Sequence, residues 1–463
     1  MTETRGGGMV KSAIILAAGK GNKMFPFNAV RSKTTIKIAG KSLIRFNIES
    51  IVAMGIKEIV VVVNEEHQRE IENLLSDIEN VKFVSDQTNL GSAESLVKGA
   101  EKLSDTKDFI VLYGDTIVEQ KDLENLVNSI KPAVLLKNLE ESSRNWIGAS
   151  IKNGFIQSIG AHYRGNSITH QFAGFHFDDT LLDYVKRTPD YFPDVKVGVG
   201  VPKERFIEAG LLKSLDKVKL KAIECSGYFF DIDKPWHMLE ANQFMVDHFC
   251  NALQENQLAE GATISANATI HGHVKLGKNS SIGDRVVIHG NLLVGDNTII
   301  DNGAIFNGNA VIGDHTKISN YCIIYDGVSI GSNCIFDHCA EFLGGMVMDK
   351  VYLYHYGEFY GAIGSHTDIG AATVCGTLRF DDGETEHVVN GRKEVPLHFS
   401  NAAYLGDYCR TGVNTIIMPG CKIGSYSVLG AGAIIDKDIE KNSLVFVKQD
   451  LIIKKWSENK YGW

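Results

Sequence analysis

The sequence predicts two domains: an α/β domain on an open, mixed but mostly parallel sheet, followed by a left-handed parallel β-helix of hexapeptide repeats. Three observations support this prediction. The 463 residues exceed what one hydrophobic core usually organises. Apolar runs alternate with amphipathic stretches in the first half, and large apolar residues recur at every sixth position in the second half.

The first domain is predicted over residues 12–238, after a disordered leader at 1–11 that is rich in glycine. Runs that are apolar throughout are typical of parallel strands buried on both faces, and the amphipathic stretches between them are typical of connecting helices. This βαβ pattern indicates an open, mostly parallel sheet. The predicted strands span 13–17, 59–63 and 109–113, and the predicted helices span 42–54, 65–75 and 92–103.

A helical linker is predicted over 239–258, and the β-helix over 259–448. A six-residue spacing with Gly, Asn or Asp near the corners is typical of a parallel β-helix, in which each flat face contributes one inward aliphatic side chain to a central column. The corner glycines include Gly277, Gly283, Gly295, Gly313 and Gly331. The unbroken series is Ile264, Ile270, Leu276, Ile282, Ile288, Val294, Ile300, Phe306, Ile312, Ile318, Ile324, Ile330, Phe336 and Phe342.

The repeat changes phase between Phe342 and Ile363, and a polar segment at 376–396 interrupts it again. Because the repeat resumes in the same phase, this segment is predicted to be a loop extruded from one corner, where solenoids often carry function. No role is predicted for the C-terminal tail at 449–463. The resumed series is Ile369, Cys375, Phe399, Leu405, Ile417, Ile423, Leu429 and Ile435.

Charge and composition exclude several classes of protein. The formal net charge of -9 leaves no basic surface for nucleic acid. No apolar run approaches the roughly 18 to 20 residues that cross a bilayer, so no membrane contact is predicted. The 8 cysteines form no C-x-x-C pair and lie in apolar segments, which predicts reduced, buried thiols and a cytoplasmic protein.

A glycine-rich segment follows the first predicted strand and reads L-A-A-G-K-G-N-K-M-F-P over 16–26. Glycines let backbone N–H groups approach an anion closely, and lysines add positive charge. The segment lacks the third glycine of the dinucleotide fingerprint and is not a P-loop. We predict a nucleotide cradle formed by Leu16, Ala18, Gly19 and Gly21; the alternative is a plain strand-to-helix turn.

This segment resembles the L-A-A-G-x-G-[TS]-R-[ML]-x-P signature of the sugar-1-phosphate nucleotidylyltransferases. Further matches follow in the same order along the chain. Lys33 and A-G-K-S-L-I at 39–44 resemble P-K…x-G-K-P-[LM]-[LI], and Q-T-N-L-G-S-A at 87–93 resembles the pyrimidine-base segment. V-L-Y-G-D at 111–115 resembles the metal strand, and F-F-D-I-D-K-P-W at 229–236 resembles the closing motif. The resemblance implies a Rossmann-like nucleotidyltransferase fold.

The roles of these residues also have a physical basis. In-line attack on the α-phosphorus of a nucleoside triphosphate needs charge neutralisation and no covalent nucleophile. Asp115 and Asp231 are the predicted Mg²⁺ ligands, with Asp233 as the close rival of Asp231. The alternative for an aspartate that ends a strand is a helix or turn cap. Lys23 and Lys33 are predicted to stabilise the α-phosphate and the leaving pyrophosphate.

The base and the sugar are predicted less fully. Gln87, Gly91 and Ser92 lie in the pyrimidine-type segment, so the resemblance implies UTP or dTTP. Asn22 and Lys23 replace the usual Thr/Ser-Arg pair, and Lys does not replace Arg at a bidentate phosphate contact. The family's acidic and asparagine sugar ligands are absent, since this chain reads I-G-A-H-Y-R at 159–164 and Q-F-A-G at 171–174. The remaining candidate substrate contacts are Gly148, Arg164 (with His162 as its alternative) and Gly174.

The whole layout resembles the bifunctional N-acetylglucosamine-1-phosphate uridylyltransferases/glucosamine-1-phosphate acetyltransferases of the archaeal type. I-G-A-A-T at 369–373 resembles their I-G-A-G-T coil, and His355 lies upstream near the position of their catalytic base. A neutral imidazole suits that role; the alternative is a structural corner histidine. The resemblance implies acetyl-CoA as co-substrate and a homo-oligomer, a trimer or a multiple of three. Candidate CoA-phosphate contacts are Arg379, Arg392, Lys393 and Arg410, each with a plain solvated side chain as the alternative.

These observations predict an enzyme that converts a nucleoside triphosphate and a sugar 1-phosphate into a nucleotide sugar and pyrophosphate. A CoA-dependent acetylation of an amino-sugar phosphate is predicted as its second activity. The alternative is a non-catalytic sugar-nucleotide sensor or assembly subunit, which keeps the fold and explains the missing sugar ligands.

Overall fold

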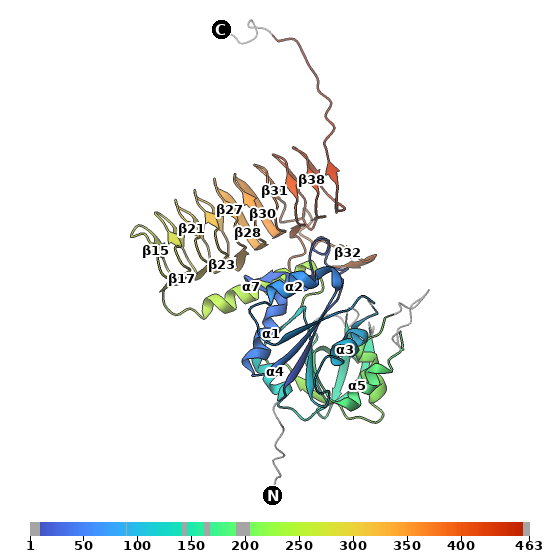
Figure 1. Cartoon of the computed structure of the whole chain (residues 1–463). Helices are drawn as coiled ribbons and strands as arrows, with labels where there is room; N and C mark the ends of the chain where they lie inside the picture. Colours follow the sequence, from blue (N-terminus) through green and yellow to red (C-terminus); the bar gives the residue numbers. More distant parts are fainter. Residues whose placement is uncertain (1–9, 89, 141–145, 162–166, 191–203, 457–463) are drawn as a thin grey trace. The chain divides into compact units, whose positions relative to one another are not determined.

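The computed structural model describes residues 10–88, 90–140, 146–161, 167–190 and 204–456. The chain divides into two compact units, Met1–Met245 and Val246–Trp463. Helix α7 (Pro235–Asn251) carries the chain from one unit into the next (Figure 1). Among the described residues, no helix is long and apolar enough to span a membrane.

A nine-stranded mixed sheet forms the centre of the first unit. In spatial order its strands are β5 (Val81–Ser85), β4 (Glu58–Val63), β1 (Ser12–Ala17), β6 (Phe109–Tyr113), β11 (His170–Phe177), β8 (Ala133–Asn138), β12 (Lys221–Glu224), β10 (Phe155–Ala161) and β9 (Ile147–Lys152). Strands β5, β4, β1 and β6 are parallel, and β11 pairs antiparallel with β6 and β8. The predicted fold class of this half is therefore confirmed, and the strands predicted at 13–17, 59–63 and 109–113 are β1, β4 and β6.

Two apolar cores cover the two faces of this sheet, and successive residues of β1 alternate between them. Helices α3 (Ser92–Ala100), α5 (Asp179–Lys186) and α6 (Ile207–Ser214) pack into one core, and α1 (Leu43–Ala53), α2 (Gln68–Leu74) and α4 (Gln120–Val127) pack into the other. The helix predicted at 65–75 divides into a 3-10 turn, η2 (Glu65–His67), and α2. The cores hold the carboxyl ends of β1 and β6 side by side, where the predicted site residues lie.

The second unit is a parallel β-helix, as predicted. Residues that pair on successive coils are 18 positions apart, as Asn291 and Asn309 illustrate. One sheet contains β14 (Gln257–Leu258), β16 (Thr269–Ile270), β17 (Val274–Leu276), β19 (Val287–Ile288), β20 (Leu292–Val294), β22 (Ile305–Phe306), β23 (Ala310–Ile312), β25 (Ile323–Ile324), β26 (Val328–Ile330), β28 (Ala340–Val347), β30 (Gly357–Ile363), β31 (Val374–Cys375), β34 (Ala403–Leu405), β36 (Ile416–Ile417), β37 (Lys422–Ile423) and β39 (Ile434–Ile435). The remaining face contains β15 (Thr263–Ile264), β18 (Ser281–Ile282), β21 (Ile299–Ile300), β24 (Lys317–Ile318), β27 (Ile335–Phe336), β29 (Tyr352–Leu353), β35 (Arg410–Thr411), β38 (Val428–Leu429) and β40 (Leu444–Val445).

The predicted inward column is present and forms one continuous apolar core. From Leu276 to Phe342 its members are buried, whereas Ile264 and Ile270 are half-buried because they belong to the first coil. The prediction for Phe399 was wrong. This residue takes a left-handed corner conformation with φ +57, and its half-buried ring stacks on Tyr360 at 6.0 Å outside the column.

The segment at 376–396, predicted as a loop, contains a β-hairpin of β32 (His387–Val389) and β33 (Arg392–Glu394). The cysteine prediction needs one correction. All 8 cysteines are free, but Cys339 is exposed and Cys225 is half-buried. Burial raises the pKa of thiols such as Cys250 to about 12, so the buried cysteines stay protonated. The cytoplasmic location expected from their reduced state stays a prediction.

Candidate active site

The turn after β6 presents Asp115 at the edge of the sheet. Gly114 donates its N–H to the carbonyl of Leu16 on β1 at 2.8 Å, and a Cβ at position 114 would lie 3.1 Å from the Cβ of Ala17. A larger residue would therefore push the turn away from β1. The chain continues into β7 (Thr116–Val118). Asp115 is thus fixed beside the glycine-rich segment that follows β1.

A buried asparagine of α1 holds this turn from behind. The amide of Asn47 donates to the carbonyls of Tyr113 and Thr116 at 3.0 and 2.9 Å, on either side of Asp115. We expect Asn47→Ala to lower kcat about 10-fold to 100-fold, as losses of supporting contacts around a metal ligand typically do. Asn242→Ala is the matched control, because Asn242 is also fully buried but holds the backbone of Ala39. Steady-state pyrophosphate release checks this; equal effects of both variants would contradict it.

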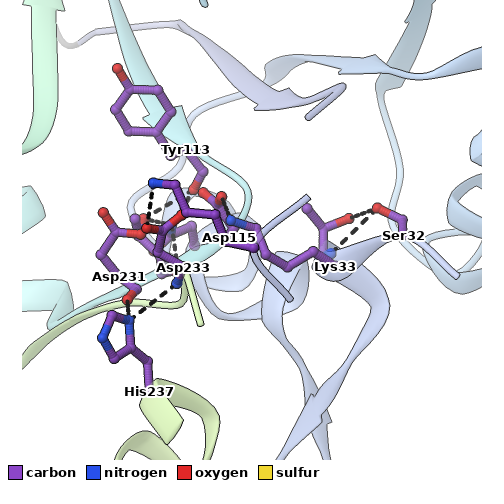
Figure 2. Close-up of polar contacts among 11 residues, drawn as sticks. Ser32, Lys33, Tyr113, Asp115, Asp231, Asp233 and His237 are labelled. Atoms are coloured by element: carbon purple, nitrogen blue, oxygen red, sulfur yellow. Dashed lines mark hydrogen bonds and ion pairs between the residues drawn. The ribbon is translucent and has the colours of Figure 1, made fainter. Parts of the chain in front are cut away.

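Strand pairing brings a distant aspartate to the same place. Strand β13 (Phe229–Asp231) pairs antiparallel with β7, with Asp231 opposite Thr116, and the N–H of Ile232 donates to the carbonyl of Asp115 at 3.1 Å. Figure 2 shows Asp115, Asp231 and Asp233 gathered around Lys33. The two predicted metal ligands, 116 positions apart in the sequence, therefore lie on one side of the molecule.

Two lysines balance this acidic cluster. Lys33 lies on a 3-10 turn, η1 (Lys33–Thr35), whose N-cap Ser32 accepts the N–H of Thr34, and its Nζ is 2.5 Å from Asp115 Oδ2. The Nζ of Lys23 is 2.8 Å from Asp233 Oδ2. The predicted cations thus contact the predicted carboxylates directly.

The pKa values of the two rival metal ligands, Asp231 and Asp233, shift in opposite directions. Burial and then the charges of Asp115 and Asp233 raise the pKa of Asp231. Burial also acts on Asp233, but Lys23 and Lys33 outweigh it and the pKa of Asp233 falls below its ordinary value. Burial would lower the pKa of Lys33, yet the three carboxylates raise it, so Lys33 stays an ammonium ion. Asp231 therefore lacks the cation that Asp233 already has.

A divalent cation fits this cluster. Mg²⁺ prefers oxygen ligands and is usually held by one or two carboxylates together with substrate phosphates and waters. Asp115 and Asp231 supply two carboxylates, and the carboxylate of Asp231 makes no ion pair within the described residues. In that same part of the chain, no three His, Cys, Asp or Glu side chains are arranged to hold a metal ion alone. The nucleotide phosphates would complete the coordination.

The glycine-rich segment lies next to the cluster. Gly21 has φ +61, which favours glycine, and Gly19, two residues earlier, is exposed with open space where a Cβ would be. A Cβ at Gly21 would lie 3.5 Å from the Cβ of Lys33. Leu16 is buried in β1, and Ala18 is half-buried. The predicted cradle is thus open to a ligand and adjacent to Lys33.

The predicted base segment is only partly free. The amide of Gln87 donates to Glu65 at 2.6 Å on the exposed edge. A Cβ on Gly91 would lie 2.4 Å from the carbonyl oxygen of Arg205, so this glycine allows a close backbone approach. Ser92 accepts the N–H of Ile207 through its hydroxyl at 3.1 Å. Gly91 and Ser92 therefore have structural roles whatever base they contact.

Two of the weaker candidates, Gly148 and Gly174, do not join the cluster. Gly148 and Gly174 are buried strand positions, where a Cβ would lie 2.3 Å from the carbonyl oxygen of His170 and 2.7 Å from Leu112 respectively. Their lack of a side chain is explained by sheet packing. Arg164 and its alternative His162 lie outside the described residues.

A cavity that sequence reasoning missed adjoins Asp231. It has a volume of about 310 Å³ and lies between β8, β11, β13 and the first turns of α7. Its walls include Trp146, Gln171, His237, Glu240 and Phe244. The sequence signal was the spacing of residues 237, 240 and 244, which places these three side chains on one face of α7. This helix begins at Pro235, inside the closing motif at 229–236.

In the second unit, the predicted acetyl-transfer base is exposed. His355 lies between β29 and β30, and its ring is 5.8 Å from that of His338. The Nδ1 of His338 lies 2.9 Å from the carbonyl oxygen of Tyr354. The coil at 369–373 follows β30 as predicted, with Ile369 buried in the column. The position of His355 leaves it open to a substrate.

The predicted CoA-phosphate contacts on the 376–396 segment are exposed and partly engaged. Arg379 forms a bidentate ion pair with Asp381 at 2.8 and 2.7 Å, and Lys393 pairs with Glu386 at 2.6 Å. Arg392 is exposed at the start of β33. A phosphate would have to displace two of these carboxylate partners.

A buried polar network anchors the same segment. His387 lies 2.7 Å from the carbonyl oxygen of Ser400 through Nε2 and 3.0 Å from the Nζ of Lys422 through Nδ1. Lys422 in turn pairs with Asp438 at 2.9 Å. Because the ammonium of Lys422 donates to Nδ1, the proton of the neutral imidazole lies on Nε2. The network ties the hairpin to the coils that follow it.

This network predicts acid sensitivity of the hairpin. Burial and the charge of Lys422 lower the pKa of His387 from 6.5 to about 4. Because the pKa of His387 is lower in the folded than in the unfolded protein, the neutral ring contributes about 3 kcal/mol to the free energy of unfolding. This contribution is complete above pH 6.5 and is lost as the pH falls towards 4. We expect limited proteolysis within 376–396 to accelerate over this range in the wild type, and the pH dependence to flatten in His387→Gln. A wild-type rate that is constant from pH 7 to 4 would contradict this.

Comparison with known proteins assigns both halves. Residues 12–134 match the nucleotidyl transferase family model. Residues 309–344 and 402–437 match the model for bacterial transferase hexapeptide repeats. The matched regions contain the glycine-rich cradle with Asp115 and parts of the β-helix before and after the hairpin.

Several relatives match the chain over nearly its whole length. The bifunctional protein GlmU of Methanococcus maripaludis strain C7 is 33% identical over 449 residues, which cover 96% of this chain and 99% of that protein. Its counterpart in Methanococcus vannielii is 29% identical over 448 residues, with 96% and 99% coverage. A protein of Sulfurisphaera tokodaii named bifunctional sugar-1-phosphate nucleotidylyltransferase/acetyltransferase is 25% identical over 448 residues, with 92% and 98% coverage.

Proposed function

The chain belongs to the family of the bifunctional protein GlmU, and from this membership we propose that it transfers a nucleotidyl group from UTP or dTTP to a sugar 1-phosphate. One observation carries the proposal. The pairing of β13 with β7 brings Asp231 to Asp115 and Lys33, next to an open glycine-rich cradle.

The geometry supports an in-line displacement. A phosphate oxygen of the sugar 1-phosphate attacks the α-phosphorus, the bond between that phosphorus and the oxygen bridging to the β-phosphate breaks, and pyrophosphate leaves. Mg²⁺ held by Asp115 and Asp231 would neutralise charge on the phosphates. Lys33, kept protonated by its carboxylate neighbours, stabilises charge on the α-phosphate, and Lys23 is placed for the leaving pyrophosphate.

Pyrophosphate release tests this function. The wild type is incubated with Mg²⁺, UTP, dTTP, CTP or ATP, and a panel of hexose 1-phosphates. Turnover with a pyrimidine nucleotide and its loss in Lys33→Met are the expected results. Lys131→Met is the control, because Lys131 also forms an ion pair with an aspartate, Asp108, at 2.8 Å. Measurable nucleotide binding without turnover for any pair would favour the sensor or assembly subunit instead.

We also propose that the β-helix acetylates an amino-sugar phosphate with acetyl-CoA, and that His355 is the general base. The exposed imidazole supports this role, since a neutral imidazole can accept the proton that the amine loses as its nitrogen attacks the thioester carbonyl and the CoA thiolate leaves. Thiol release from acetyl-CoA with glucosamine 1-phosphate measures the activity. His355→Ala should abolish it while His338→Ala retains it; activity that survives in His355→Ala would rule out this base.

We propose that copies of the chain associate, as a trimer or a multiple of three, through one outer face of the β-helix. On this face, outward residues of successive coils lie next to one another in a row that runs along the whole solenoid. Most positions of the row are apolar. From one strand to the next, the paired residues of this row are Thr269, Val287, Ile305, Ile323, Glu341, Glu358, Val374, Ile416 and Ile434. Two apolar runs, Val287 to Ile323 and Val374 to Ile434, lie on either side of Glu341 and Glu358, and apolar surface of this kind marks an interaction site.

Substitution in this row tests the assembly. We expect Ile305→Asp to convert the oligomer to monomer in light scattering after size exclusion, because it buries a charge in the proposed interface. Ile299→Asp is the control, since Ile299 is 45% exposed on the face formed by β15 to β29. A wild type that is monomeric, or an Ile305→Asp variant of unchanged mass, would contradict the proposal.

A further inference from the structure

The residues at the start of α6 pack against the predicted base segment. The N–H of Ala93 donates to the carbonyl of Arg205 at 3.0 Å, and the N–H of Arg205 donates to the carbonyl of Leu90 at 2.5 Å. The hydroxyl oxygen of Ser92 accepts the N–H of Ile207 at 3.1 Å. The two segments are therefore joined through their backbones, and a shift of one moves the other.

The side chain of Arg205 fixes the start of α6 from the other side. Its guanidinium pairs with Glu94 on α3 and donates to the carbonyls of Lys186 and Thr188 at 2.9 and 3.2 Å. Charge-assisted hydrogen bonds of this kind are stronger than neutral ones. The first turn of α6 therefore has a defined position relative to α3 and the end of α5.

Within this first turn, Glu208 contacts the end of strand β6. Tyr113 donates its phenol hydroxyl to Glu208 Oε1 at 2.7 Å. Tyr113 is the last residue of β6 and precedes Asp115 by two positions. Its ring packs edge-on against Phe175, with ring centres 5.8 Å apart, and Figure 2 shows it pointing away from the carboxylate cluster. The contact thus links α6 to the strand that leads into the predicted metal ligand.

Tyr113 also connects Glu208 to the base segment. Burial, followed by the charge of Glu208, raises the pKa of Tyr113, whereas a hydrogen bond with Ser92 acts in the opposite direction. A hydrogen bond that lowers the pKa of a phenol is donated to its oxygen, so the hydroxyl of Ser92 is the donor. The N–H of Ile207 thus donates to Ser92, Ser92 to Tyr113 and Tyr113 to Glu208, which closes a circuit of hydrogen bonds. Hydrogen bonds linked in this way polarise and strengthen one another.

Glu208 is a costly residue at this position. It is 5% exposed, and its second oxygen, Oε2, is buried without a hydrogen-bond partner among the described residues. Burial raises the pKa of Glu208 against the hydrogen bond from Tyr113, and the neighbouring charge of Glu204 adds to the rise. A buried, incompletely bonded carboxyl costs free energy that an apolar side chain of similar size would not. Fold stability therefore does not account for a glutamate here.

We propose that Glu208 is a positioning residue for the nucleotide, which holds the base segment in place through Tyr113 and Ser92. The proposal rests on the function proposed above. The circuit joins residues 90–93 to the end of β6, so it sets the place of the base relative to Asp115. Because the carboxylates and lysines of the cluster are outside the circuit, its loss should weaken nucleotide binding and leave the chemical step nearly intact.

Steady-state kinetics with matched variants test this role. Glu208→Leu removes the acceptor, and we expect the KM for UTP or dTTP to rise about 10-fold, with kcat and the KM for the sugar 1-phosphate within about twofold. Glu208→Gln keeps an acceptor oxygen and should restore most of the nucleotide affinity. Glu124→Leu is the control, because Glu124 is half-buried on α4 and accepts from Gln120. An unchanged nucleotide KM in Glu208→Leu, or a Glu208→Gln variant that is equally impaired, overturns the proposal.

Nucleotide binding without turnover separates this proposal from the proposed function. UTP or dTTP with Mg²⁺ is titrated calorimetrically into the wild type, Glu208→Leu, Tyr113→Phe and the double variant, in the absence of a sugar phosphate. The effect of Glu208→Leu on the Kd should fall below about twofold in the Tyr113→Phe background, because the two residues act through one contact. Absence of turnover with every substrate pair would reject the enzymatic function, and this cycle would still decide the role of Glu208. Additive effects of the two substitutions, or a wild type that binds neither nucleotide, overturn the proposal.

Discussion

Asp231→Asn is expected to lower kcat for nucleotidyl transfer about 100-fold to 1,000-fold, which is the typical cost of losing one group that stabilises transition-state charge. The side chain keeps its size, so the loss comes from the missing charge. Asp231 is the carboxylate of the cluster without an ion pair in the described structure, whereas Asp115 contacts Lys33 and Asp233 contacts Lys23. Asp115→Asn should have an effect of similar size.

Asp233→Asn is the control that separates the two rival metal ligands. Because Asp233 already pairs with Lys23 at 2.8 Å, its loss should weaken pyrophosphate positioning more than metal binding. The measurement is the Mg²⁺ concentration for half-maximal pyrophosphate release, supported by Mn²⁺ binding followed by electron paramagnetic resonance. Asp231→Asn should raise the metal requirement and Asp233→Asn should leave it nearly unchanged. The reverse order would make Asp233 the metal ligand.

Ile300→Ala is expected to destabilise the β-helix by about 2 to 5 kcal/mol, the usual cost of deleting a buried aliphatic side chain. Ile300 is fully buried in the inward column and belongs to the continuous apolar core. Such interiors are close-packed, so neighbouring coils relax only partly into the space left behind. The effect should be larger than that of any substitution on the outer surface.

The neighbouring residue provides the control. Ile299 lies on the same strand, β21, but faces outward and is 45% exposed. Ile299→Ala should cost less than about 1 kcal/mol, since surface substitutions usually change stability little. Chemical unfolding of both variants, followed by circular dichroism, measures the difference. Equal midpoints for the two variants would mean that the column does not limit the stability of this unit.

The sequence predicted the regular parts of the fold because their periodicities are physical requirements. A six-residue repeat cannot bury its aliphatic side chains except by stacking coils, and all-apolar runs require cover on both faces. Phe399 was misplaced because its spacing fits the repeat, while its left-handed backbone puts it on a corner. Spacing alone does not specify backbone conformation, so the hairpin within 376–396 was also missed.

The candidate site was predictable where one short segment carries several groups. Lys23, Lys33, Asp115 and Asp231 were identified from local motifs, and the structure brings them together through the β13–β7 pairing. Asn47 was not identified from the sequence, because a buried asparagine on a helix has no local pattern that indicates which turn its side chain contacts. The cavity was not predictable either, since its walls come from distant strands and one helix.

Asp231 borders both the acidic cluster and the cavity, and this double position constrains how the protein can diverge. Trp146 and Gln171 line the cavity only, so they can change while the carboxylate cluster stays intact. Asp231 has no such freedom, because any replacement alters both halves of the site at once.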